Sequence, residues 1–119
     1  MTATIDLFRN ADNRIEFPAG HTIFEKGQPG DVMYVVIAGQ VEVLIRDEII
    51  NSIGPGGILG EMALIDAEPR SATAVAKTDC QLVPINLKRF AFLVQQTPYF
   101  AIEVMRIMAG RLRKKDPQG

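Results

Sequence analysis

Residues 58–72 read Ile-Leu-Gly-Glu-Met-Ala-Leu-Ile-Asp-Ala-Glu-Pro-Arg-Ser-Ala, and they follow a turn-forming Gly-Pro-Gly-Gly run. Gly60 has no Cβ, so a ligand can approach its backbone closely. A short helix beginning at Glu61 would present unpaired N–H groups, which favour an anion. Arg70 adds a planar fork of donors that fits two phosphate oxygens, whereas an ionised Glu61 only accepts hydrogen bonds and suits a sugar hydroxyl. The stretch therefore predicts a site for a nucleotide-like ligand.

A plainer interpretation of the same charges stays open. Glu61 and Arg70 are nine positions apart, so their side chains converge only if the segment folds back on itself. A glutamate and an arginine that flank a loop can also form a surface ion pair worth about 0–1 kcal/mol. The combination of residues and spacing, rather than either charge alone, favours the ligand site.

The pattern Gly60-Glu61-x-Ala63-Leu64 followed by Pro69-Arg70-Ser71-Ala72 resembles the phosphate-binding cassette of cyclic-nucleotide-binding domains. Such domains occur in bacterial catabolite-activator proteins, cyclic-nucleotide-dependent kinases and gated channels, and the resemblance extends over roughly residues 14–115. It implies that backbone amides, Arg70 and Ser71 hold the cyclic phosphate, and that Glu61 holds the ribose 2′-hydroxyl. The predicted ligand-binding residues are Leu59, Gly60, Glu61, Met62, Ala63, Arg70, Ser71 and Ala72.

Composition limits the class of protein. A chain of 119 residues with 47% hydrophobic and 23% charged residues fits one globular domain with a sizeable core. The net charge of −1 favours no nucleic-acid partner, and neither a run of about 18 apolar residues nor a secretory signal is visible. The single Cys80 excludes an internal disulfide, is expected to be a buried inert thiol, and favours a cytoplasmic location.

About eight short strands precede residue 86, which predicts a β-sandwich or roll, and the resemblance sharpens this to a jelly-roll-like β-roll. Residues 31–37 and 41–46 are expected to pair as a hairpin, with the next turn at residues 47–48. Pro84 cannot donate to a ladder, which predicts an edge strand or an irregular end. We divide the chain into an N-terminal helical or irregular segment (1–13), a β-roll that contains the cassette (14–86) and C-terminal helices with a tail (87–119).

Two helices are predicted to follow the roll. Asn86 can cap a helix over residues 87–96, and Thr97-Pro98 marks the start of a second helix that runs to about Lys114. This second helix is apolar around most of its circumference, so it needs two partners. One is the roll, and the resemblance implies that the other is the same helix of a second chain, although both faces could instead be buried within one chain. The basic residues 111–115 are favoured by the helix dipole and do not predict DNA binding.

We therefore expect a free-standing sensor that binds cyclic AMP, with cyclic GMP as the alternative, and transmits binding through its C-terminal helices to an unknown effector. No cofactor, metal or catalytic residue is predicted, and the residue that covers the base is left open. The sequence ends at Gly119 without a helix-turn-helix segment. Whether it is a complete sensor or a piece of a larger protein stays open.

Two other functions remain possible at this stage. A degenerate copy of the cassette could serve as a pure interaction module. A cupin-type enzyme shares the β-roll, but its metal centres need several histidines, and this chain has only His21, expected in an exposed turn. Titration with cyclic nucleotides separates saturable binding, turnover and silence.

Overall fold

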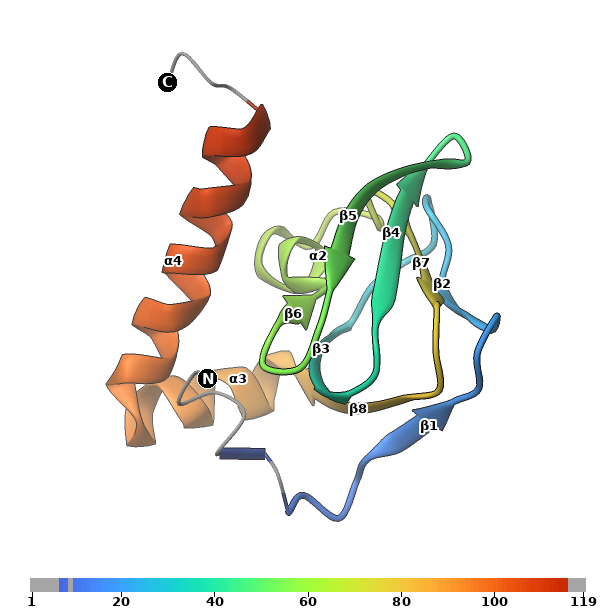
Figure 1. Ribbon diagram of the computed structural model, residues 1–119. Coiled ribbons are helices and arrows are strands. Elements are labelled where there is room, and N and C mark those ends of the chain that lie inside the picture. The colour runs from blue at the N-terminus through green and yellow to red at the C-terminus, as the bar shows by residue number, and fades with distance from the viewer. Residues whose placement is uncertain (1–6, 9, 116–119) are drawn as a thin grey trace.

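A computed structural model describes residues 7–8 and 10–115, with side-chain surroundings up to residue 113. Within these residues, eight strands form two four-stranded sheets, the short helix α2 lies between β6 and β7, and α3 and α4 follow the last strand (Figure 1). The elements are β1 (Ile15–Phe17), β2 (Thr22–Phe24), β3 (Val32–Ala38), β4 (Val41–Ile45), β5 (Glu48–Ile53), β6 (Ile58–Leu59), α2 (Glu61–Asp66), β7 (Thr73–Ala76), β8 (Cys80–Asn86), α3 (Leu87–Gln96) and α4 (Pro98–Lys115).

The two sheets are antiparallel and share no strand. One has the order β1-β8-β3-β6 and the other the order β2-β7-β4-β5. Except for the consecutive pair β4-β5, neighbours in each sheet are therefore not consecutive in sequence, as in a jelly-roll-like β-roll. The predicted β-roll with a short cassette helix and two C-terminal helices is confirmed. In the described part of the chain, no helix combines the length and apolar character needed to cross a bilayer.

The sheet that contains β3 and β8 is buried on both faces. Met33 and Val35 face a core that also contains Phe100 and Val104 of α4, whereas Val36 belongs to the core between the two sheets. β8 alternates in the same way, because successive side chains of a strand point to opposite faces. The molecule thus has three layers (Figure 1). They are the β2-β7-β4-β5 sheet, which we call the outer sheet, the β1-β8-β3-β6 sheet, which we call the inner sheet, and the helices. This double burial explains why the inner strands are almost continuously apolar.

The predicted hairpin of residues 31–37 with 41–46 is wrong. β3 and β4 belong to different sheets, and Gly39 lies between them with a φ of 92°. Alternation identifies a strand but not its partner, and a left-handed glycine lets the chain turn from one sheet into the other. β4 instead pairs with β5 through a turn at Arg46 and Asp47, one residue earlier than predicted. Both turn residues have positive φ, which is the geometry of a type I′ hairpin turn.

The prediction for Pro84 is also corrected, because β8 is an interior strand between β1 and β3. The pairing with β1 ends at Leu82 opposite Ile15, so β1 does not extend along β8 as far as Pro84. The carbonyl of Pro84 accepts a 3.5 Å hydrogen bond from the Asn13 amide on that side. Proline has no N–H to donate, and it is tolerated there because β1 has no ladder residue opposite it that would need such a donor.

The helical segment begins as the capping residues predict. The Asn86 side chain accepts a 2.8 Å hydrogen bond from the Arg89 backbone N–H at the start of α3. Thr97 separates α3 from α4, and Phe100 near the start of α4 packs edge-on against Phe8 and Phe90. Phe8 is buried, so this part of the predicted N-terminal segment anchors on the domain, while residues 1–6 and 9 lie outside the described residues.

Candidate ligand-binding site

The cassette lies where the inner sheet meets α4. β6 pairs with β3 and leads into Gly60, whose φ of 79° is left-handed, and α2 begins at the next residue. Gly60 is needed there for two reasons, because an L side chain is strained at this φ and its Cβ would collide with the Arg70 guanidinium. The structure therefore requires glycine at this position, and the close approach of a ligand to its backbone remains a prediction.

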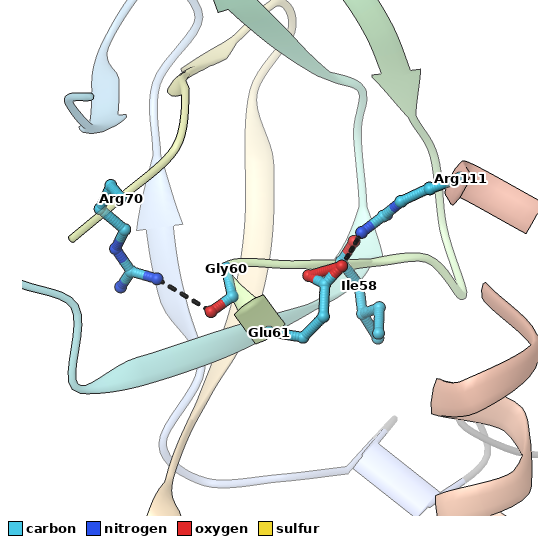
Figure 2. Close-up of polar contacts among 5 residues, drawn as sticks. All are labelled: Ile58, Gly60, Glu61, Arg70 and Arg111. Atoms are coloured by element: carbon cyan, nitrogen blue, oxygen red, sulfur yellow. Dashed lines mark hydrogen bonds and ion pairs between the residues drawn. The ribbon is translucent and has the colours of Figure 1, made fainter. Parts of the chain in front are cut away.

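Arg70 folds back onto this glycine. Its Nη1 donates to the Gly60 carbonyl at 3.0 Å (Figure 2). Its Nη2 donates to the Val32 carbonyl at 2.7 Å. The side chain is only 5% exposed, and its Nε is a buried donor without a hydrogen-bond partner among the described residues. A buried unpaired N–H costs free energy, which an anion at this position would recover.

The backbone of Arg70 is fixed by the loop between β2 and β3. Its N–H donates to the Gln28 carbonyl at 2.8 Å, and its own carbonyl accepts from the Gly27 N–H at 2.9 Å. These two bonds fasten the end of the cassette to a loop more than forty residues earlier in the sequence. The convergence of Arg70 on Gly60 therefore depends on the whole roll rather than on the cassette alone.

Glu61 has a different partner. Its Oε1 accepts a hydrogen bond from Nη1 of Arg111, which comes from α4, and Nη2 of Arg111 donates to the Ile58 carbonyl (Figure 2). Glu61 is 3% exposed and the Arg111 side chain is 30% exposed, so the pair is largely withdrawn from water. Figure 2 shows Arg70 and Arg111 approaching the start of α2 from opposite sides. The two predicted charges of the cassette thus lie next to the same turn but do not pair with each other.

The remaining predicted site residues fall into two groups. Leu59, Ala63 and Ala72 are buried, and their roles in binding remain predictions. Met62 and Ser71 are exposed, so their side chains point away from the core. The roles predicted for the Met62 amide and the Ser71 hydroxyl remain predictions.

The electrostatic setting of Arg70 suits an anion. Burial lowers the pKa of Arg70 below its usual range, while the neighbouring Tyr34, Asp31 and Glu61 raise it. An arginine keeps its charge at neutral pH even with such a shift. Burial likewise raises the pKa of the Tyr34 hydroxyl, against the opposing effect of Arg70. Arg70 is therefore a buried cation whose charge a bound anion would balance.

Sequence reasoning missed Arg111, which it assigned to a basic helix end. A signal was present, because Phe100, Val104, Ile107 and Arg111 follow one another at helical spacing. The first two are buried and Ile107 is packed against the same core, so Arg111 continues an inward-facing stripe. A charged residue on such a stripe indicates a buried acceptor, which here is Glu61.

A hollow of about 630 Å³ lies on another part of the surface, between the N-terminal segment and β8. Phe8, Pro84 and Arg89 border it, and none of the predicted ligand-binding residues does. Among the residues that the structure describes, Arg89 is the single arginine of its lining, so the cassette with its two arginines is the better candidate site.

The sequence of residues 14–97 matches the family model described as the cyclic nucleotide-binding domain. The chain belongs to this family. It is 32% identical over 117 residues to the Cyclic AMP receptor protein of Thermus thermophilus, with 94% of this chain and 54% of the relative covered. It is 42% identical over 89 residues to a cyclic nucleotide-gated potassium channel of Mesorhizobium japonicum, with 75% of this chain and 24% of the channel covered.

Solved structures agree with this assignment. The Thermus thermophilus Catabolite Activator Protein has a TM-score of 0.82 and 30% identity, covering 99% of this chain and 58% of that one. The structure reported under "A cyclic-GMP-dependent signalling pathway regulates bacterial phytopathogenesis" has a TM-score of 0.79 and 31% identity, covering 96% of this domain and 95% of that chain. The domain spans about half the length of curated relatives such as the Thermus receptor.

Proposed function

We propose that this domain is a non-catalytic sensor that binds a purine 3′,5′-cyclic monophosphate in the cassette over residues 58–72, with cyclic AMP preferred to cyclic GMP. The observation that carries the proposal is Arg70, which is buried beside Gly60 with an unpaired Nε. A cyclic phosphate supplies one negative charge and acceptor oxygens in the geometry that an arginine fork recognises. The preference for cyclic AMP is supported by relatives named as cyclic AMP receptors, and cyclic GMP stays the alternative.

Glu61 is proposed to bind the ribose 2′-hydroxyl while it remains paired with Arg111. An ionised carboxylate has two acceptor oxygens, and the Arg111 bond uses Oε1. A hydroxyl can therefore be added without displacing Arg111. The base would then rest on the apolar lining that includes Leu59 and Ala72.

Transmission is proposed to run from the cassette to α4, because Arg111 connects Glu61 and the Ile58 carbonyl to that helix. A ligand that favours one position of the cassette would then favour one position of α3 and α4, provided that its affinity differs between the two. The effector that reads this change is unknown, and we propose no direct contact with DNA. Cytoplasmic action is part of the same proposal.

The outer face of α4 is proposed to pair with a second copy of the chain. Ile102, Met105, Ala109 and Leu112 are spaced three, four and three residues apart, which is the spacing of a coiled-coil seam. All four are exposed in the single chain, and Leu112 reaches 65%. Residues 98–114 would thus gain the second partner that their apolar circumference requires.

Isothermal titration calorimetry with cyclic AMP, cyclic GMP and 2′-deoxy cyclic AMP tests the proposal. Arg70→Ala is expected to weaken binding by about 2–5 kcal/mol, since a buried charge pair loses one partner. Arg70→Lys keeps the charge but loses the fork, and Arg113→Ala serves as an exposed control on α4. Recovery of intact nucleotide after incubation tests the absence of turnover. Lack of saturable binding to all three compounds would overturn the sensor function.

A further inference from the structure

We propose that Phe24 is a positioning residue for ligand binding, whose ring holds the Arg70 guanidinium so that its unpaired Nε–H edge is available to the anion. This inference rests on the proposed function, because it concerns the same phosphate site. It assigns a binding role to an aromatic residue of β2, a strand outside the cassette.

The contact between the two side chains is close. The guanidinium carbon of Arg70 lies 4.2 Å from the centroid of the Phe24 ring, well within the range of a cation–π interaction. Such contacts strengthen when they are withdrawn from water, and Arg70 is 5% exposed. The ring therefore supports the guanidinium through its face rather than through a hydrogen bond.

Phe24 is itself held by a row of rings. It stacks on Tyr34 of β3 with centroids 6.3 Å apart and an interplanar angle of 20°. Phe17 of β1 packs edge-on against Tyr34, with ring centroids 6.3 Å apart and an interplanar angle of 89°. Because β1 and β3 belong to one sheet and β2 to the other, the row joins both sheets and ends at Arg70.

The hydrogen bonds of Arg70 complete the restraint. Nη1 and Nη2 are tied to the carbonyls of Gly60 and Val32, and the ring covers the guanidinium carbon. A guanidinium has five N–H groups, and these two bonds use two of them. The Nε–H and the remaining Nη hydrogens are thus fixed in direction, as a preformed fork for phosphate oxygens.

Gly30 keeps the same guanidinium free of a steric clash. A Cβ at Gly30 would lie 2.6 Å from both Cζ and Nε of Arg70, and 2.8 Å from the Cβ of Ala63. The φ of Gly30 is not in the left-handed region, so the glycine is required by space rather than by backbone conformation. A methyl group there would push the guanidinium away from its two carbonyl partners.

A purely structural role for Phe24 makes a different prediction, since the ring also packs against the core between the sheets. Phe24→Leu removes the ring face and keeps an apolar side chain, whereas Phe24→Tyr keeps the face. Phe17→Leu is the matched control, because Phe17 belongs to the same row and core but its contact in the row is with Tyr34 rather than Arg70. Only a positioning role separates the two leucine variants by affinity.

The experiment is calorimetric titration of the full chain with cyclic AMP and cyclic GMP, alongside urea unfolding of each variant. Phe24→Leu is expected to weaken binding about 3- to 30-fold, Phe24→Tyr to retain it, and Phe17→Leu to bind like wild type even if it unfolds more easily. In an Arg70→Lys background, Phe24→Leu should cause a smaller further loss, because the two residues act as one unit. If Phe24→Leu does not fold, Phe24→Met, which also removes the ring face and keeps an apolar side chain, provides the second test and should also weaken binding.

The outcomes separate the two proposals. If wild type binds and Phe24→Leu, or Phe24→Met in its place, binds equally well, the positioning role is overturned while the sensor function stands. If Phe17→Leu loses as much affinity as Phe24→Leu, the effect is general loosening of the roll, and the positioning role is again overturned. If wild type binds neither nucleotide, the proposed function fails and this inference fails with it.

Discussion

Replacement of Arg111 by alanine should release the C-terminal part of α4 from the cassette. Arg111 donates hydrogen bonds to the nearly inaccessible carboxylate of Glu61 and to the Ile58 carbonyl at the same time. Removal of one partner of a fully buried pair costs about 3–5 kcal/mol. The Arg111 side chain is 30% exposed, and water can reach the space it leaves, so we expect a smaller loss of about 2–3 kcal/mol in the free energy of unfolding.

A double-mutant cycle isolates the pair. Arg111→Ala, Glu61→Gln and the double variant should show a coupling energy of about 1–3 kcal/mol in equilibrium urea unfolding, because the two side chains are in direct contact. Arg113→Ala is the control, since Arg113 is an exposed arginine two residues further along the same helix. Its effect on stability should stay within about 0.5 kcal/mol.

Amide hydrogen exchange gives a second readout of the same prediction. The amides of residues 109–113 should exchange faster in Arg111→Ala, whereas the amides around Phe100 and Val104 should keep their protection. Those two residues are buried in the core beneath α4 and do not depend on Arg111. A coupling energy near zero together with unchanged exchange would refute the view that Arg111 fastens α4 to the cassette.

Two further predictions concern single side chains. Asn86→Ala should destabilise the domain by about 1 kcal/mol in urea unfolding, because the Arg89 N–H loses its cap, while Asn86→Asp should retain most of the stability. Burial raises the pKa of Tyr34 above its ordinary value. The stability that neutral Tyr34 contributes is therefore fully present below about pH 10 and is lost as the pH rises through the higher pKa of the folded state. Tyr34→Phe should lessen this alkaline loss in thermal unfolding measured from pH 8 upward, and an unchanged pH profile would show that another group is responsible.

The sequence was informative wherever a feature is local. The cap at Asn86 gave the correct start of α3 because its side chain accepts from the Arg89 N–H within one turn, and Thr97-Pro98 gave the correct start of α4 because proline is favoured in a first turn. Gly60 marked the left-handed start of α2 because glycine adopts a positive φ without strain. The cassette could therefore be located before its surroundings were known, although the position of Arg70 within it also depends on the loop between β2 and β3.

Partners that are distant in sequence were not predictable in the same way. The hairpin prediction for β3 and β4 failed because alternation is equally compatible with pairing across the roll, as the β3–β8 ladder shows. The acceptors of Arg70 include the Val32 carbonyl, and a carbonyl is present at every residue, so no side-chain pattern indicates it. The pairing of Arg111 with Glu61 spans fifty positions and follows from the packing of α4 on the roll.

The placement of the two arginines bears on how binding at one side of the cassette can affect α4. Arg70 contacts Gly60 and Arg111 contacts Glu61, which are adjacent residues at the start of a helix of only six residues. A helix of that length rises about 9 Å and is too short to bend between its ends, so its first turn moves as a unit. Under the proposed transmission, an anion that changes the Arg70–Gly60 contact would also change the position of Glu61. Because Glu61 is withdrawn from water, Arg111 has to follow it or leave a buried charge unpaired, and the energy of that choice is what would move α4.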